Sequence, residues 1–128
     1  MFKIIANFFK PSKESKELQD WYIVTWDIDY IYRNVSPPGQ KAWSDQFRWV
    51  DIERICFEAS ESLYTDDIYF FTTKRPESYV VPIESKGGAE LWQVILEKKL
   101  FDAELAIKAA TSLGGIYCWP KENEKIGL

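Results

Sequence analysis

Histidine is absent from the 128 residues of the chain, and this absence sets the first limits on function. Histidine is the commonest general base, the commonest metal ligand and the simplest pH switch in proteins. A Ser-His-Asp triad, a Cys-His pair and a zincin site are therefore excluded. Catalysis would have to rely on carboxylates, lysine, tyrosine or cysteine, and we expect no catalytic residue and no metal site.

Signals for phosphate and nucleic-acid binding are also missing. The glycine pairs Gly87-Gly88 and Gly114-Gly115 lack the spacing and the Lys-Ser/Thr step of a phosphate-binding loop. The formal net charge is −4, and no basic stripe interleaves with the aromatic residues. Proteins that bind nucleic acids generally carry a basic patch or stripe. We therefore expect neither a cofactor nor a nucleic-acid partner.

Cysteine is scarce. The chain has two cysteines, Cys56 and Cys118, which lie far apart in the sequence and form no CxxC motif. Each stands among apolar neighbours, in the stretches RICFE and IYCWP. We expect two buried, reduced thiols. A disulfide is the alternative, although a chain of this size does not need one to fold.

The first twenty residues differ from the rest of the chain. Apolar residues recur at helical spacing before Pro11, but this segment is too short to span a bilayer, and no signal peptide is expected. Residues 1–16 hold four lysines and one glutamate, a net charge of +3, so the remaining residues carry −7. We expect residues 1–20 to form a basic amphipathic arm and linker, followed by a single domain over 21–128. The arm would pack on its own body or on a second copy, or alternatively lie weakly on an anionic membrane through Phe2, Ile5, Phe8 and Phe9.

The segment from residue 21 to residue 85 shows the alternation of β-strands. Aromatic residues make up 16% of the chain and hydrophobic residues 46%, which is typical of a globular domain. Apolar residues occupy the even positions of 21–33, which predicts one long strand with a bend near Asp27. Further strands are expected over 47–58, with a kink at 50–52, and over 68–73. A hairpin turn at 74–77 would lead to a partner strand over 78–85, with Pro82 at its end or on an edge.

The C-terminal third changes to helical periodicity. Residues 91–98 fit one helix, and Asp102 is a good N-cap for a second helix. The apolar stripe of that second helix is expected to consist of Ala103, Ala106, Ile107, Ala110 and Leu113. A last short strand is expected over 116–119. This order predicts an α+β fold with a mainly antiparallel curved sheet of about five to seven strands and two C-terminal helices, similar to a pleckstrin-homology (PH) or GRAM domain.

An ordered set of short motifs runs from Phe47 to Pro120. These motifs are WVDIERI (49–55), TDDIYFF (65–71), VVPIES with the glycines that follow (80–88), LFD (100–102) and YCWP (117–120). In this set the chain resembles a family of small uncharacterised bacterial proteins, which share W-x-D-I, D-D-[IV]-[FY]-[WF], V-P, G-x-x-L, F-D and C-W motifs. That family has no established activity, so the resemblance implies no catalytic residues. It implies particular backbone roles for Asp51, Asp67, Pro82, Gly88 and Asp102.

The neighbouring carboxylates Asp66 and Asp67 are the first candidate site. Adjacent side chains of an extended strand point to opposite faces, so the two could not chelate one ion from within a strand. We interpret the pair as a cap or turn at the start of a buried strand. The alternative is that the pair converges with Asp51 or Glu53 on a cation. The wider acidic set is expected to form a solvated face, and it comprises Asp45, Asp51, Glu53, Glu58, Glu61, Asp66 and Asp67.

The second candidate site is aromatic. Of the six tryptophans, Trp43 stands beside polar residues and is expected to be the most exposed. Together with Tyr64, Asp66 and Asp67 it forms our candidate partner-binding site. We predict a non-enzymatic, cytoplasmic bacterial protein that acts as a protein-binding or accessory, immunity-like module and that could form a homo-oligomer. The alternatives are a peripheral module at the inner membrane, which would use the N-terminal arm, and a carboxylate-dependent hydrolase.

Overall fold

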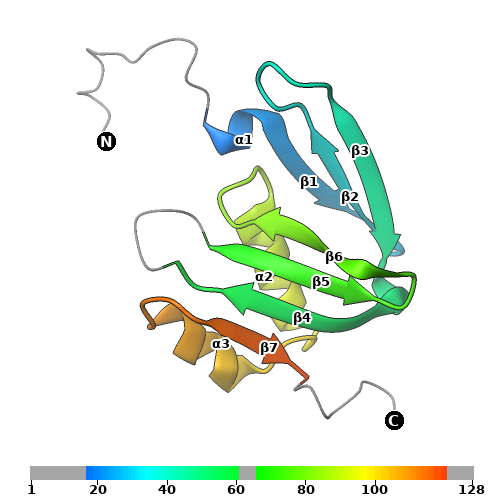
Figure 1. Cartoon of the computed structure of the whole chain (residues 1–128). Helices are drawn as coiled ribbons and strands as arrows, with labels where there is room; N and C mark the ends of the chain where they lie inside the picture. Colours follow the sequence, from blue (N-terminus) through cyan, green and yellow to red (C-terminus); the bar gives the residue numbers. More distant parts are fainter. Residues whose placement is uncertain (1–16, 61–65, 121–128) are drawn as a thin grey trace, which may run out of the picture.

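The computed structural model describes residues 17–60 and 66–120 (Figure 1). The arm contacts predicted for Phe2, Ile5, Phe8 and Phe9, and the candidate binding residue Tyr64, lie outside the described residues. The first described element is the short helix α1 (Leu18–Trp21). It begins inside the stretch that was expected to be a linker, at residues 18–20. The backbone N–H of Glu17 donates to the Asp20 carboxylate, which helps to begin the helix.

The first sheet has three antiparallel strands in the order β1-β2-β3: β1 (Tyr22–Trp26), β2 (Tyr30–Val35) and β3 (Trp43–Arg48). The Asp27 carboxylate accepts hydrogen bonds from the N–H groups of Asp29 and Tyr30 at 2.9 and 2.8 Å. This local bonding closes a tight turn, so residues 21–33 form a hairpin and not one bent strand. The reversal shifts the alternation by one residue. Ile31 and Arg33 therefore face inward, and Ile28 is exposed.

The second sheet has four antiparallel strands in the order β6-β5-β4-β7. These are β4 (Ile52–Glu58), β5 (Asp67–Thr72), β6 (Arg75–Pro82) and β7 (Ile116–Trp119). A 3₁₀ turn, η2 (Trp49–Asp51), separates β3 from β4, so the strand predicted over 47–58 is divided between the two sheets. The β5–β6 turn falls at residues 73–74, earlier than predicted. Pro82 ends β6 as expected.

Two helices lie between β6 and β7: α2 (Gly88–Glu97) and α3 (Ala103–Ala110). The predicted N-cap is confirmed, because the N–H of Leu105 donates to the Asp102 carboxylate at 2.9 Å. Gly88 is required where α2 begins, since a Cβ there would lie 2.3 Å from the carbonyl oxygen of Pro82. The apolar stripe predicted for the second helix is only partly right. Ala106 packs against the core, whereas the side chains of Ile107 and Leu113 are 66% and 90% exposed.

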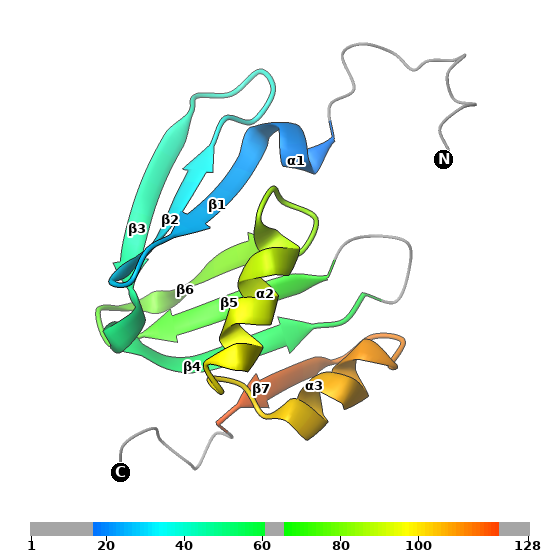
Figure 2. The same cartoon turned by 180° about the vertical axis from the view of Figure 1, so that it is seen from behind.

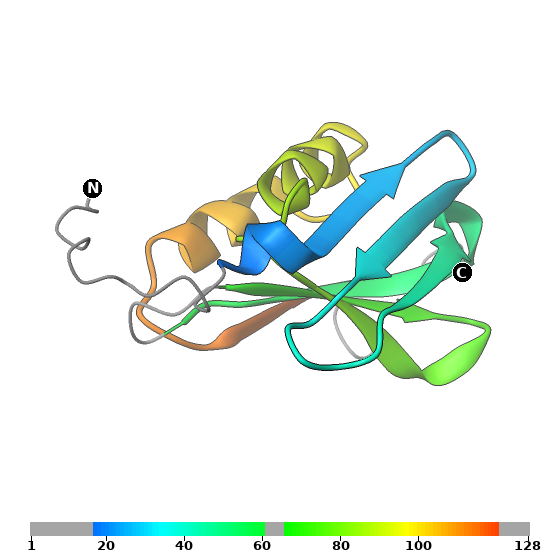
Figure 3. The same cartoon turned by 90° about the horizontal axis from the view of Figure 1, so that it is seen from above.

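The helices and the three-stranded sheet lie on the same side of the four-stranded sheet (Figures 2 and 3). The core fills the space between these layers. Ile31 of β2, Phe70 of β5 and Leu91 of α2 are fully buried there. Phe47 of β3 stacks on Tyr79 of β6 with ring centroids 4.2 Å apart, which joins the two sheets. The other side of the four-stranded sheet has no described element over it (Figure 1).

The α+β class is confirmed, with seven antiparallel strands and two helices near the C-terminus. The strands form two sheets that do not close on each other, where a single curved sheet was expected. The division follows from the 3₁₀ turn at Trp49–Asp51, where the chain leaves one sheet and starts the other.

The cysteine prediction is wrong. Cys56 and Cys118 form a disulfide that joins β4 to β7. The two residues are directly opposite each other in the antiparallel register of these strands. Spacing along the chain gave no sign of this pairing, because 62 residues separate the two cysteines.

Candidate protein-binding surface

The candidate surface is the uncovered side of the four-stranded sheet, which we call the open sheet face. Side chains alternate between the two sides of a strand, so the side opposite the buried Ile55, Ile68 and Val81 is fixed by the register. The open sheet face comprises Arg54, Cys56, Glu58, Asp67, Tyr69, Phe71, Val80, Pro82, Ile116 and Cys118.

The centre of the open sheet face is apolar. Tyr69 lies directly between Val80 on one neighbouring strand and Cys56 on the other. Cys56 in turn lies opposite Cys118, to which its sulfur is bonded. Apolar groups therefore cross all four strands in one row. At the β7 edge the neighbouring side chain of Ile116 is 62% exposed.

One end of the face carries two carboxylates. Glu58 of β4 and Asp67 of β5 are directly opposite each other, with Ile116 and Pro82 completing the row. The phenol of Tyr69 donates a hydrogen bond to Glu58, which raises the pKa of Tyr69 to about 12. Burial raises the pKa of the Asp67 carboxyl, and the negative charges of Glu58 and Asp66 raise it further. Within the described ranges, neither Glu58 nor Asp67 forms an ion pair.

Asp66 and Asp67 separate, because Asp66 precedes β5 and Asp67 is its first residue. The Asp66 carboxylate accepts a hydrogen bond from the N–H of Ser60 at 2.7 Å, so it bridges the two ends of the β4–β5 connection. Asp67 is the first residue of β5 and belongs to the open sheet face. Ile68 and Phe70, which follow, are fully buried, and this confirms that the pair stands at the start of a core strand. Among the described residues, no group of three or more Cys, Asp and Glu side chains is arranged to hold a metal ion.

Trp43 lies on the other sheet. It is the first residue of β3 and is 42% exposed, and it alone among the described tryptophans belongs to the exposed hydrophobic residues, as predicted. Its ring centroid lies 4.8 Å from the guanidinium carbon of Arg33. The predicted partner-binding set is therefore divided between two sheets: Asp67 lies on the open sheet face, and Trp43 lies at the start of β3 in the three-stranded sheet.

Arg33 organises the junction of the two sheets and was missed by sequence reasoning. Its guanidinium makes a two-point ion pair with Asp45, with N–O distances of 2.9 and 2.6 Å. It also donates to the carbonyl oxygen of Val80 at 3.0 Å, and Tyr22 donates to the same oxygen. A buried arginine needs this degree of pairing, because an unpaired charge would be costly to remove from water. Alternation through Asp27 had placed Arg33 on the polar side.

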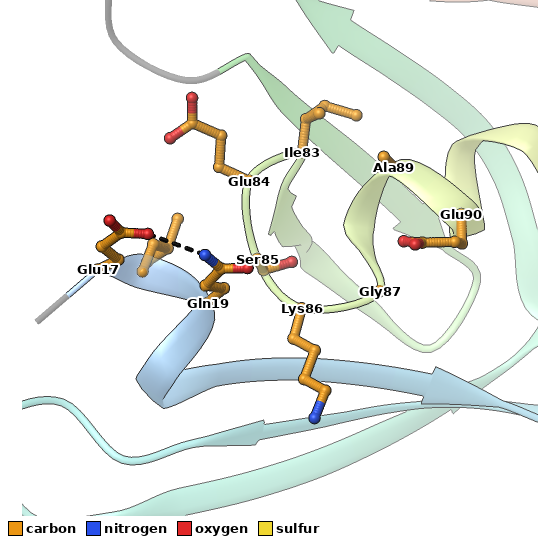
Figure 4. A pocket seen from close by; sticks show the side chains of 10 residues that line it. Glu17, Gln19, Ile83, Glu84, Ser85, Lys86, Gly87, Ala89 and Glu90 are labelled. Carbon is orange, nitrogen blue, oxygen red and sulfur yellow. Dashed lines mark hydrogen bonds between the residues drawn. The ribbon is translucent and has the colours of Figure 1, made fainter. Parts of the chain in front are cut away.

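A cavity of about 680 Å³ lies between α1 and the loop that precedes α2 (Figure 4). The carboxylates of Glu17, Glu84 and Glu90 line it together with Lys86. The amide of Gln19 donates to Glu17 at 2.8 Å. The buried hydroxyl of Ser85 donates to the carbonyl oxygen of Pro82. Asp67, the carboxyl with the raised pKa, does not line this cavity.

Comparisons with known proteins assign no family. No protein-family model matches the chain, and no curated protein and no solved structure is significantly similar to it. Over residues 17–60 and 66–120, no helix is long and apolar enough to cross a bilayer.

Proposed function

We propose that the chain is a non-enzymatic protein-binding module whose partner docks on the open sheet face. The observation that supports this proposal is the combination of an apolar row across four strands with no described element over it. Most antiparallel sheets that face water on one side carry polar residues there. An apolar, aromatic centre with charged residues toward its ends is typical of a protein-binding surface.

The proposal includes the finer expectations drawn from the sequence. The module would act as an accessory or immunity-like protein. Its fold would be a variant of the pleckstrin-homology or GRAM type, in which β7 returns after two helices to pair with β4. The two alternative functions have less support. A carboxylate-dependent hydrolase would need its acid pair in a cleft, and Glu58 and Asp67 lie on an open sheet. A membrane-surface role would depend on the N-terminal arm, outside the described residues.

Site-specific photocrosslinking in cells of the native host tests the proposal. A photoreactive phenylalanine analogue replaces Tyr69 on the open sheet face, or Gln46 on the exposed side of β3 as the matched control. We expect a discrete protein adduct from position 69 that is absent at position 46. The adduct should disappear when Ile116 is changed to glutamate in the same chain. Equal adducts from both positions, or none from position 69, would contradict the proposed surface.

A further inference from the structure

The carboxylate end of the open sheet face has a charge that the described part of the chain does not balance. Glu58 and Asp67 are directly opposite each other on neighbouring strands. Like charges directly opposite each other on neighbouring strands destabilise a sheet. Elsewhere in the fold, the carboxylate of Asp45 on β3 is neutralised by an ion pair with Arg33. Among the described residues, Glu58 accepts a hydrogen bond from the neutral phenol of Tyr69, and neither Glu58 nor Asp67 has a cationic partner.

Apolar surface adjoins these two carboxylates on both sides. Ile116, mostly exposed, is the cross-strand neighbour of Glu58, and Pro82 is the cross-strand neighbour of Asp67. Tyr69 stands one row away along β5, toward the centre of the face. The carboxylate pair is therefore surrounded by groups that favour the removal of water. Suppose that a partner places a cationic side chain, flanked by apolar side chains, over Glu58 and Asp67. The apolar groups would exclude water around the cation, and its attraction to the two carboxylates would be stronger than in water.

We infer that the open sheet face binds a segment of another protein that presents a lysine or arginine between apolar side chains, with the cation placed over Glu58 and Asp67. This inference rests on the proposed function and names the chemistry of the partner. The partner's apolar side chains would contact Tyr69 and Ile116. The net charge of −7 over residues 17–128 would also favour the approach of a basic partner.

The test uses a random twelve-residue peptide library displayed on phage and selected on the full chain at physiological salt. The selection is repeated on two double variants that lose the same charge. In Glu58→Gln/Asp67→Asn the carboxylate pair is removed, and in Glu77→Gln/Glu104→Gln two exposed carboxylates elsewhere are removed. Glutamine at position 58 keeps an acceptor for Tyr69, and circular dichroism checks that each variant is folded.

We expect wild-type selections to enrich peptides with a basic residue flanked by apolar ones. Measured by fluorescence anisotropy, their affinity should fall at least tenfold in Glu58→Gln/Asp67→Asn and less than twofold in the control variant. Equal losses in both variants would show attraction to overall charge and would overturn the inference. A failure to enrich any peptide on the wild-type chain would also overturn it.

Two further results separate the inference from the proposed function. Enriched peptides that lack a basic residue, but whose binding is abolished by Tyr69→Ala, would refute the inference and leave the proposed surface in place. Peptides whose binding no substitution on the open sheet face affects would refute both. Sedimentation analysis of the full chain tests whether a second copy of the chain occupies the open sheet face. A dimer that Tyr69→Ala dissociates would assign the face to a second copy and overturn the inference.

Discussion

The disulfide between Cys56 and Cys118 should contribute a large share of the stability of the fold. The perturbation is reduction of the wild-type protein with a dithiol, or the substitution Cys118→Ser, which removes the half-buried partner and keeps the buried one. A cross-link between residues 62 positions apart restricts the unfolded chain. The loss of that restriction raises the entropy of the unfolded chain by about 14 cal/mol/K, which corresponds to about 4 kcal/mol near room temperature.

Equilibrium unfolding in urea measures this effect. With a slope of about 2 kcal/mol per molar urea, a loss of about 4 kcal/mol moves the midpoint down by about 2 M. Domains have unfolding free energies of about 5–15 kcal/mol, so the reduced protein should remain folded without urea but with a smaller margin. The reductant should have no further effect on Cys118→Ser, which controls for its other actions. An unchanged midpoint on reduction, or two free thiols titrated in the unreduced native protein, would refute the reasoning.

Three further perturbations test the packing and the electrostatics. Gly88→Ala should destabilise the fold by about 1–3 kcal/mol in urea unfolding, because the added Cβ would overlap the carbonyl of Pro82. Asp45→Asn should cost about 1–3 kcal/mol by the same assay, because Arg33 stays buried without its charge partner; no change in midpoint would mean that the ion pair does not stabilise the buried arginine. Asp67→Asn should stabilise the fold at neutral pH. The raised pKa of Asp67 means that the folded state holds its proton more tightly, so the wild type should lose stability relative to the variant as pH rises through the carboxylate range, and parallel pH profiles would contradict this.

The fold class could be predicted from the sequence because periodicity and capping are local signals. Asp102 was identified as an N-cap from its position before an apolar helical pattern, and the structure shows the hydrogen bond. Pro82 was placed at a strand end because proline cannot donate to a sheet ladder. Alternation cannot show where a strand reverses. Asp27 closes a hairpin through its own side chain, so Ile28 was wrongly expected to face the core and Arg33 was wrongly expected to face solvent.

In α3 the helix was predicted correctly, but tertiary packing decided which of its faces is buried. The apolar residues of this helix span more than one face, and periodicity alone favoured the face that includes Ile107. The structure turns Leu105 and Ala109 toward the core and leaves Ile107 exposed. Which side of a short helix faces the sheet depends on the loops that hold it, here the capped start at Asp102 and the turn that leads to β7.

The candidate site needed strand register, which the sequence does not contain. Asp66 and Asp67 were expected to diverge, and they do, but the residue opposite Asp67 could be identified only from the β4–β5 pairing. Glu58 was one member of a seven-residue acidic set, with nothing local to distinguish it. The same limitation hid the disulfide, since Cys56 and Cys118 meet through the β4–β7 pairing.

Asp45 and Asp67 are strand carboxylates with different neighbours: Asp45 lies opposite a cation, and Asp67 lies opposite another carboxylate. Asp45 lies opposite Arg33 and forms an ion pair with it, and Arg33 also donates to the carbonyl oxygen of Val80 on the other sheet. Asp67 lies opposite Glu58 on a face that no described element covers, and burial raises its pKa where no described cation offsets the charge. A fold that only had to be stable would gain from an amide or a basic residue at Glu58 or at Asp67, which are directly opposite each other. Asp67→Asn therefore separates stability from the proposed binding: it should increase the stability of the fold while it weakens binding of the basic peptides.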